Sequence, residues 1–292
     1  MLGAIIGDIT GSIYEYNNDK PRNFKIDNAF SYIMKHPNLR LTDDSLLTIA
    51  VAKVLLNNYP IKYDNQSINK IQDELRYEFI ETVKKHPLAG FGYLFYNWCE
   101  QATNGDPTPY NSYGNGAAMR ISSVAYIAKS EDEVKELSKI VTEITHNHPD
   151  GIKGAECVAL CVYKALHGAT KEEIKEFVIK KYYPRIKKLD YEDLVANYDF
   201  NTTCKGSIPE AIYCFLISDS LRDTIEKCIS IGGDSDTIAC IAGGIAEAYY
   251  QKDQLSAFED AYIYLMLDQE VTDLLTKLYQ ASGSAKFIKK TE

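Results

Sequence analysis

The chain has 292 residues, of which 45% are hydrophobic and 25% are charged. These fractions are typical of a globular protein and exclude disordered, collagen-like and membrane-spanning classes. A formal net charge of -9 disfavours non-specific binding to a nucleic-acid backbone. The surplus of carboxylates also raises the question of whether some of them bind a cation.

The cysteines and the N-terminal segment indicate a cytoplasmic protein. The seven cysteines form no CxxC pair, and their odd number and mostly apolar neighbours are typical of reduced thiols. The first residues, MLGAIIGDITGS, lack a basic segment, and Asp8 interrupts their apolar run, so they do not resemble a signal peptide. No apolar stretch approaches the roughly 18 residues that span a bilayer.

Helical periodicity dominates the chain from end to end. Helices are predicted near the N-terminus up to Glu15 and then, in chain order, at 46–56, 67–85, 90–102, 134–144, 152–167, 171–181, 207–219, 221–231, 238–249 and 270–281. The segment 46–56 is apolar almost all round, which predicts a helix buried inside a bundle.

Loops are predicted at 57–60, 104–109 and 147–151, and residues 16–41 are expected to form a longer excursion. No strand-like alternation of useful length occurs. We therefore expect an all-α fold, a compact orthogonal bundle of many helices that forms a single domain over residues 1–292.

Two acidic clusters stand at the starts of predicted apolar helices. The first is Thr42, Asp43 and Asp44, and the second is Asp234, Asp236 and Thr237. Each cluster alone is typical of an ordinary helix start, with a capping residue and carboxylates favoured by the helix dipole. As a pair, they predict that four carboxylates and two hydroxyl groups meet at one end of the bundle.

Such a meeting point predicts a metal-binding cleft. Ligand sets made only of oxygen suit Mg2+, Mn2+ or Ca2+ rather than Zn2+. Four carboxylates without a cation would repel one another, so one or two divalent cations are the expected companions. Two ions at such a place can orient an oxygen-rich substrate and activate water.

Two glycine-containing segments are further candidates. In the segment from Ser112 to Gly116, alternating glycines allow backbone N–H groups to approach a ligand, and the next residues can begin a helix that attracts phosphate. The same residues are also typical of an ordinary Asn-Gly turn. In GDITGSIYE, Gly7 and Gly11 allow close helix packing, and Glu15 ends the helix as either a solvated or a functional residue.

His146 and His148 form a pair at the end of a predicted helix. A zinc site is disfavoured because no third nitrogen or sulfur ligand has suitable spacing. We expect histidines whose charge the helix dipole favours. The absence of GxSxG and GxxxxGK[ST] motifs excludes the nucleophile elbow and the P-loop.

Taken together and in this order, GDITGSIYE, LTDDS, SYGNGAAMR, Thr145-His146 and GGDSDTIA resemble the ADP-ribosylglycohydrolase family, from residue 3 to about residue 250. The resemblance implies an all-α fold whose cleft holds two Mg2+ ions, with Mn2+ as a substitute. It implies hydrolysis of the glycosidic bond between ADP-ribose and a modified protein side chain.

The resemblance also assigns roles to residues of this chain. The implied metal ligands are Thr42, Asp43, Asp44, Asp234, Asp236 and Thr237. The implied substrate contacts are Ser112, Tyr113, Gly114, Asn115, Gly116 and His146. Glu15, Asp44 and Asp234 are the predicted catalytic carboxylates.

Two other functions stay open at this point. One is an ADP-ribose-binding module without turnover, and the other is a metal-dependent nucleotide phosphohydrolase. The expected partner is an ADP-ribosylated protein or a small-molecule ADP-ribose conjugate. No membrane partner is expected, nor a nucleic acid unless it carries an ADP-ribosylated end, and the protein is expected to be a monomer.

Overall fold

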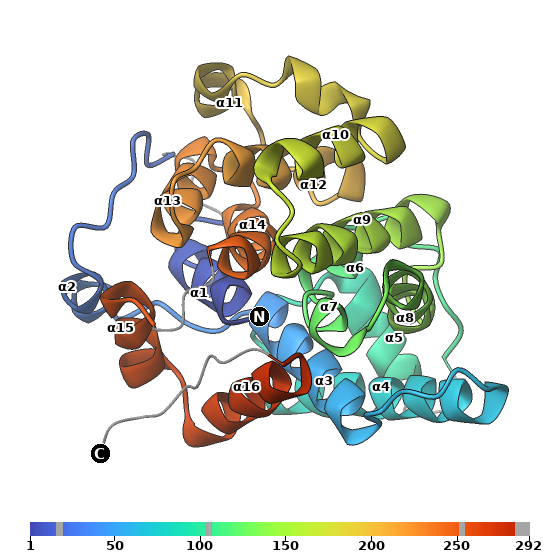
Figure 1. The fold of residues 1–292 in the computed structure, drawn as a ribbon. Coiled ribbons are helices and arrows are strands. Elements are labelled where there is room, and N and C mark those ends of the chain that lie inside the picture. The colour runs from blue at the N-terminus through green and yellow to red at the C-terminus, as the bar shows by residue number, and fades with distance from the viewer. Residues whose placement is uncertain (16–19, 103–104, 106, 251–254, 284–292) are drawn as a thin grey trace.

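The computed structural model describes residues 1–15, 20–102, 105, 107–250 and 255–283 (Figure 1). These residues form α-helices, one short 3-10 helix and an isolated β-bridge between Gly114 and Thr203, and they form no strand. The predicted all-α fold is confirmed. None of the described helices is long and apolar enough to cross a membrane.

The helices have the following bounds. In chain order they are α1 (Leu2–Gly11), α2 (Ala29–Lys35), α3 (Asp43–Asn57), α4 (Asn65–Lys85), α5 (Tyr93–Ala102), α6 (Gly116–Met119), α7 (Val124–Ile127), α8 (Glu131–Glu143), α9 (Pro149–Leu166), α10 (Lys171–Lys181), η1 (Pro184–Lys188), α11 (Tyr191–Asn197), α12 (Cys204–Leu216), α13 (Leu221–Ile231), α14 (Ser235–Tyr249), α15 (Ala257–Met266) and α16 (Gln269–Ala281).

Every helix predicted from periodicity is present, with its ends shifted by a few residues. The prediction that Glu15 ends the first helix is wrong, because α1 ends at Gly11 and Glu15 lies in the turn that follows. The loop predicted at 147–151 is wrong in part, because His148 caps α9 and Pro149 is its first residue. The loop at 104–109 and the excursion at 16–41, which contains α2, lie partly outside the described residues.

Helices α1 and α14 lie side by side in the middle of the molecule (Figure 1). A Cβ atom added at Gly7 would fall 2.1 Å from the carbonyl oxygen of Ala239. One added at Gly11 would fall 2.5 Å from the Cα atom of Asp236. The two backbones therefore touch, and the predicted close packing through these glycines is confirmed. The contact brings Asp8, on the same helix, close to the N-terminus of α14.

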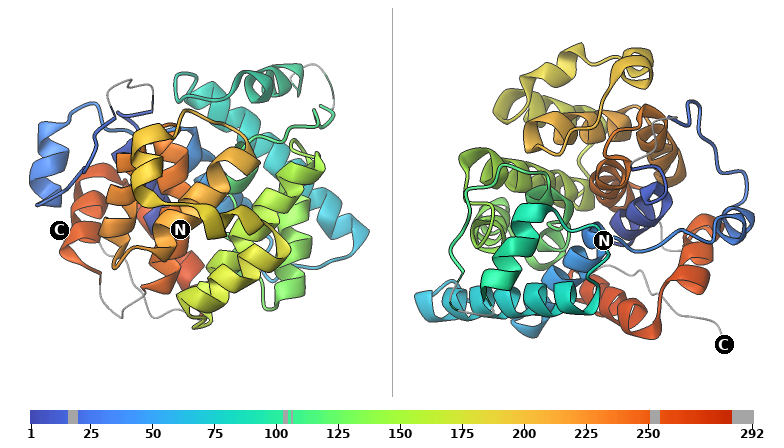
Figure 2. Two further views of the ribbon diagram at one scale, coloured as in Figure 1. Left: turned by 90° about the horizontal axis from the view of Figure 1, so that it is seen from above. Right: turned by 180° about the vertical axis from the view of Figure 1, so that it is seen from behind.

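The other helices enclose this central pair. Helices α9, α12 and α13 pack against α14, and α3 packs against α1. The view from behind shows α10 and α11 on one outer side and α4 and α16 on the opposite side (Figure 2). All seven cysteines are buried and unpaired, as predicted. The arrangement brings the N-terminal ends of α3 and α14 to the same place, next to α6.

Candidate metal centre and substrate pocket

A pocket of about 360 Å3 opens where these helix ends meet, which is a usual size for a small-molecule site. Its wall combines carboxylates, aromatic rings and the glycine-containing segment. The predicted site residues that line it are Glu15, Asp43, Asp44, Ser112, Gly114, Asn115, Gly116, His146, Asp234 and Thr237. Thr42 and Asp236 lie behind this lining and are almost completely buried.

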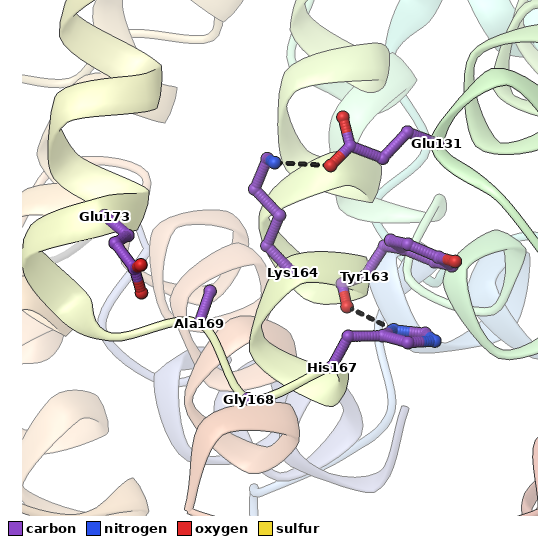
Figure 3. Close-up of a pocket in the computed structure, with 7 residues that line it drawn as sticks. All are labelled: Glu131, Tyr163, Lys164, His167, Gly168, Ala169 and Glu173. Carbon is purple, nitrogen blue, oxygen red and sulfur yellow. Dashed lines mark hydrogen bonds and ion pairs between the residues drawn. The ribbon is translucent and has the colours of Figure 1, made fainter.

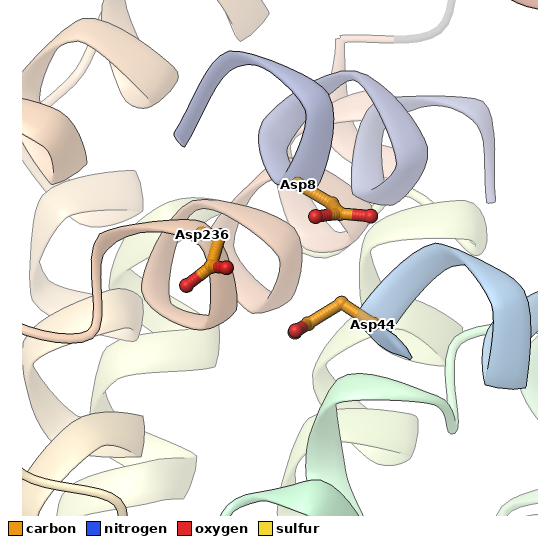
Figure 4. Close-up of side chains that lie close together, drawn as sticks. All are labelled: Asp8, Asp44 and Asp236. Carbon is orange, nitrogen blue, oxygen red and sulfur yellow. The ribbon is translucent and has the colours of Figure 1, made fainter. Parts of the chain in front are cut away.

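Two groups of three carboxylates meet at one end of the pocket. In the first group, one carboxylate oxygen each of Asp8, Asp44 and Asp236 lie within 4.8 Å of one another. Figure 4 shows these three side chains pointing toward one another from α1, α3 and α14. In the second group, oxygens of Glu15, Asp234 and Asp236 meet within the same distance. Asp236 belongs to both groups, so the two acidic clusters form one continuous centre.

Asp8 is part of this centre although the sequence did not single it out as a site residue. Its Oδ2 accepts the backbone N–H groups of Thr42 and Ser45, both at 3.0 Å, and its Oδ1 accepts the Thr42 hydroxyl at 2.5 Å. Both oxygens are thus engaged by the start of α3, so Asp8 fixes this helix start beside the centre. In the sequence, the role of Asp8 is indicated by its being a carboxylate inside a mostly apolar helix.

The capping predicted for Thr42 is wrong. Thr42 occupies the N-cap position of α3, but its side chain caps no backbone N–H group. Asp8 replaces it as the acceptor, and the single hydroxyl proton of Thr42 goes to Asp8. The lone pairs of the Thr42 oxygen are therefore left for another partner.

Asp44 offers an oxygen that suits a cation. Its Oδ2 accepts the hydroxyl of Thr237 at 3.2 Å, a contact that joins the two clusters. Its Oδ1 is buried and has no hydrogen-bond partner among the described residues. A buried carboxylate oxygen without a donor is unfavourable unless a cation satisfies it. The oxygen-only donor set fits a hard divalent cation such as Mg2+.

Asp234 connects the metal centre to the glycine-containing segment. It follows Gly232 and Gly233, whose φ angles of 71° and 74° are readily adopted only by glycine. Asp234 stands at the N-cap position of α14 but caps no backbone N–H group, so the capping predicted for this cluster is also wrong. Instead, its Oδ2 accepts the side-chain amide of Asn115 at 2.6 Å.

Burial and mutual repulsion act on all of these acids. Burial raises the pKa of Asp43, Asp44 and Asp236 well above its usual range, and neighbouring carboxylates raise it further. Burial also raises the pKa of Asp234, although the hydrogen bond from Asn115 opposes the shift. A cation in this centre would remove the repulsion that produces part of these shifts.

Residues of the segment from Ser112 to Gly116 form the wall of the pocket next to Asp234. The N–H of Gly114 donates to Ser112 Oγ at 3.1 Å, and the N–H of Asn115 donates to the carbonyl of Thr202 at 2.8 Å. The helix expected after this segment is α6, which has only one turn. These two amides are therefore engaged within the protein, and a ligand on this wall meets side chains as well as backbone.

Tyr113 does not line the same pocket as its neighbours. Its side chain is 54% exposed and lines an adjoining pocket of about 270 Å3 together with His148 and Lys205. Its ring packs edge-on against that of His148, with 5.4 Å between the ring centroids. Of the substrate residues expected from the sequence, Tyr113 is therefore the one that faces a separate surface.

His146 is buried on the glycine-containing wall and does not behave as a helix-end cation. Burial and the nearby guanidinium of Arg120 lower its pKa well below the usual range. The prediction that the helix dipole favours its charge is therefore wrong, because desolvation is the larger effect. Sequence reasoning gave Arg120 no role, although it ends the SYGNGAAMR segment and lines the pocket.

A second pocket, of about 370 Å3, lies between the end of α9 and the start of α10 (Figure 3). Its Lys164 pairs with Glu131 at 2.5 Å, and its Glu173 closes a capping box with Thr170. Because these charged groups satisfy one another, no set of them converges on a ligand. The acidic pocket, which gathers most of the predicted site residues, is the candidate functional site.

The comparisons with known proteins point to one family. The model of the ADP-ribosylglycohydrolase family matches residues 1–285. ADP-ribosylhydrolase ARH3 of Mus musculus is 26% identical over an alignment of 318 positions that covers 87% of this chain and 84% of that protein. The Homo sapiens protein of the same name is also 26% identical, covering 87% and 85%. A solved structure described as an ADP-ribosylglycohydrolase-related protein complex has the same fold, with a TM-score of 0.66, 19% identity, and coverage of 96% and 97%.

Proposed function

The chain belongs to the ADP-ribosylglycohydrolase family, and from this membership we propose that it is a Mg2+-dependent hydrolase that removes ADP-ribose from a modified protein side chain. The family hydrolyses glycosidic bonds of ADP-ribose and is metal-dependent. The observation that carries the proposal is the position of Asp236, which joins two groups of three carboxylates at one end of a pocket.

We propose that this centre holds two Mg2+ ions, for which Mn2+ can substitute. The residues that would hold them are Thr42, Asp43, Asp44, Asp234, Asp236 and Thr237. When bound, such ions polarise substrate oxygens and lower the pKa of water. The unsatisfied Oδ1 of Asp44 and the raised pKa values of the acids support this assignment.

Glu15 is the proposed proton acceptor in hydrolysis. The oxygen of a water molecule bonds to the anomeric carbon, the bond to the protein side chain breaks, and the electron pair leaves with that side chain. The water proton then needs a base within reach. Glu15 lines the pocket and is only half-buried, whereas Asp44 and Asp234 are almost completely buried. Asp44 and Asp234 would instead orient the ribose for attack.

The glycine-containing wall would hold the rest of ADP-ribose. Ser112, Gly114, Asn115, Gly116 and His146 line the same pocket as the carboxylates, and we propose that they contact the ribose and diphosphate. Tyr113 would extend this surface into the adjoining pocket.

The test uses peptides that carry ADP-ribose on arginine or on serine. We expect release of free ADP-ribose in the presence of Mg2+ and its loss when EDTA removes the metal. Release that ignores EDTA, or no release from either linkage, contradicts the proposal. Tight ADP-ribose binding without release would identify a binding module, and phosphate as the product would identify a nucleotide phosphohydrolase.

A further inference from the structure

Arg120 is a buried cation next to the pocket. Its side chain is completely buried, and its guanidinium carbon lies 4.7 Å from the ring centroid of Phe79 and 5.6 Å from that of Phe95. Its Nη2 donates to the hydroxyl of Thr145 at 2.6 Å. Its Nε and Nη1 have no hydrogen-bond partner among the described residues. The faces of the two aromatic rings stabilise the positive charge of the guanidinium, and the guanidinium donates a short hydrogen bond to Thr145.

This contact determines which nitrogen of His146 carries the proton. His146 Nδ1 lies 2.8 Å from Thr145 Oγ1 and 3.4 Å from Arg120 Nη2. A guanidinium can only donate, so the Arg120 contact calls for a lone pair on Nδ1. The Thr145 hydroxyl, whose other acceptor is the Thr142 carbonyl at 3.4 Å, then donates to Nδ1 at the shorter distance. Nδ1 must therefore accept, and the proton of the neutral ring is on Nε2.

The opposite edge of the ring faces the glycine-containing wall. A Cβ atom at Gly116 would fall 3.3 Å from His146 Nε2, and one at Gly114 would fall 3.7 Å from it. Because both positions are glycine, no Cβ atom of Gly114 or Gly116 stands in front of Nε2. The N–H groups of Gly114 and Asn115 already donate within the protein. The N–H group at Nε2 of His146 can therefore give a ligand the hydrogen bond that those two amides do not give.

We propose that Arg120 and Thr145 are positioning residues that hold His146 as the neutral tautomer with its proton on Nε2, so that the ring presents one fixed hydrogen-bond donor to an oxygen atom of the ligand. Adding a proton to Nδ1 would place a second positive charge against Arg120, and the low pKa of His146 is consistent with this. The identity of the ligand as ADP-ribose rests on the proposed function, but the tautomer does not.

Nitrogen NMR of the metal-free protein tests the tautomer directly. The full chain is labelled with 15N-histidine, and the His146→Gln variant identifies the signals of His146. We expect Nδ1 to resonate as an unprotonated nitrogen and Nε2 as a protonated one. A ring protonated on Nδ1, or on both nitrogens, at about pH 7 overturns the proposal. Arg120→Gln, whose amide can accept as well as donate, should allow the other tautomer, and Thr145→Val should do so in part.

A double-mutant cycle tests whether Thr145 acts through His146. The readout is the Kd for ADP-ribose with Mg2+ present. Thr145→Val should raise this Kd about tenfold in the natural protein. In the His146→Gln background, where the side-chain amide always carries a donor, the same change should be less than about twofold. Equal losses in both backgrounds would mean that Thr145 has only a structural role.

Thr142→Val is the matched control for Thr145→Val. Thr142 is also completely buried, and its hydroxyl has no partner among the described residues. We expect no change in Kd or in the His146 signals. Failure of the natural protein to bind ADP-ribose would contradict the proposed function, while the NMR result would still decide the tautomer.

Discussion

Asp8 on α1 caps α3, since its Oδ2 accepts the backbone N–H of Ser45 at 3.0 Å. A residue from another helix thus does the work that Thr42, at the N-cap position, would ordinarily do. The consequence is functional, because the side chains of Thr42 and Asp44 are left to face the acidic centre.

Asp8→Asn should therefore destabilise the fold by about 1–3 kcal/mol. The amide oxygen can still accept both backbone N–H groups, but as a neutral acceptor, and the NH2 group replaces the oxygen that accepts the Thr42 hydroxyl. Urea unfolding measures the change. Asp64→Asn is the control, since Asp64 is an exposed N-cap of α4 and asparagine caps equally well. Equal stability losses in the two variants would show that Asp8 has no special capping role.

Asp236→Asn should separate metal binding from folding. In EDTA the variant should melt at or above the temperature of the natural protein, because one of several repelling carboxylates is gone. With Mg2+ the natural protein should gain stability and the variant should gain little. Activity should fall by more than about 100-fold. An unchanged Mg2+-dependent gain in melting temperature would remove Asp236 from the ligands. The control is Asp132→Asn, at an exposed position of α8.

Two adjacent glycines of α14 should respond oppositely to alanine. A Cβ atom at Gly243 would fall 2.2 Å from the backbone oxygen of Gly3, so Gly243→Ala should force α1 and α14 apart at about 3 kcal/mol or more. At Gly244 the nearest atoms lie 3.4 Å and 3.5 Å away, and alanine should stabilise the helix by about 0.4–1 kcal/mol. Thermal melting of both variants decides the point. A tolerated Gly243→Ala would mean that the two backbones do not touch.

His146 should make stability depend on pH. Its pKa is lowered in the folded protein, so the unfolded chain binds the extra proton below about pH 6.5. Folding should therefore lose about 1.4 kcal/mol per pH unit from this group as the pH falls below that value. His146→Gln removes this pH-dependent loss. On acidification, the variant should therefore become more stable relative to the natural protein. A pH-independent difference would contradict a buried, neutral histidine.

The sequence predicted the long elements well, for a physical reason. Helices such as α3, α8 and α14 carry enough turns for a 3.6-residue apolar repeat to show. The one-turn helices α6 and α7 are too short to display such a repeat. The early start of α9 depends on capping by His148, which a loop-like Asn-His-Pro segment conceals.

The candidate site was predictable in its residue types but not in its bonding. Both acidic clusters were identified from their positions before apolar helices, yet the capping assigned to them is made by neither Thr42 nor Asp234. The role of Asp8 depends on the packing of α1, and the neutral state of His146 depends on Arg120. Such contacts between separate elements exist only once the chain has folded.

A crystal structure with Mn2+ and ADP-ribose would test the account most directly, because the anomalous signal of Mn2+ identifies the metal. We predict two metal positions that share Asp236, ribose hydroxyl oxygens beside them, and His146 Nε2 within hydrogen-bond distance of an oxygen of ADP-ribose. A structure in which ADP-ribose lies elsewhere, or in which no metal contacts Asp236, would contradict the account.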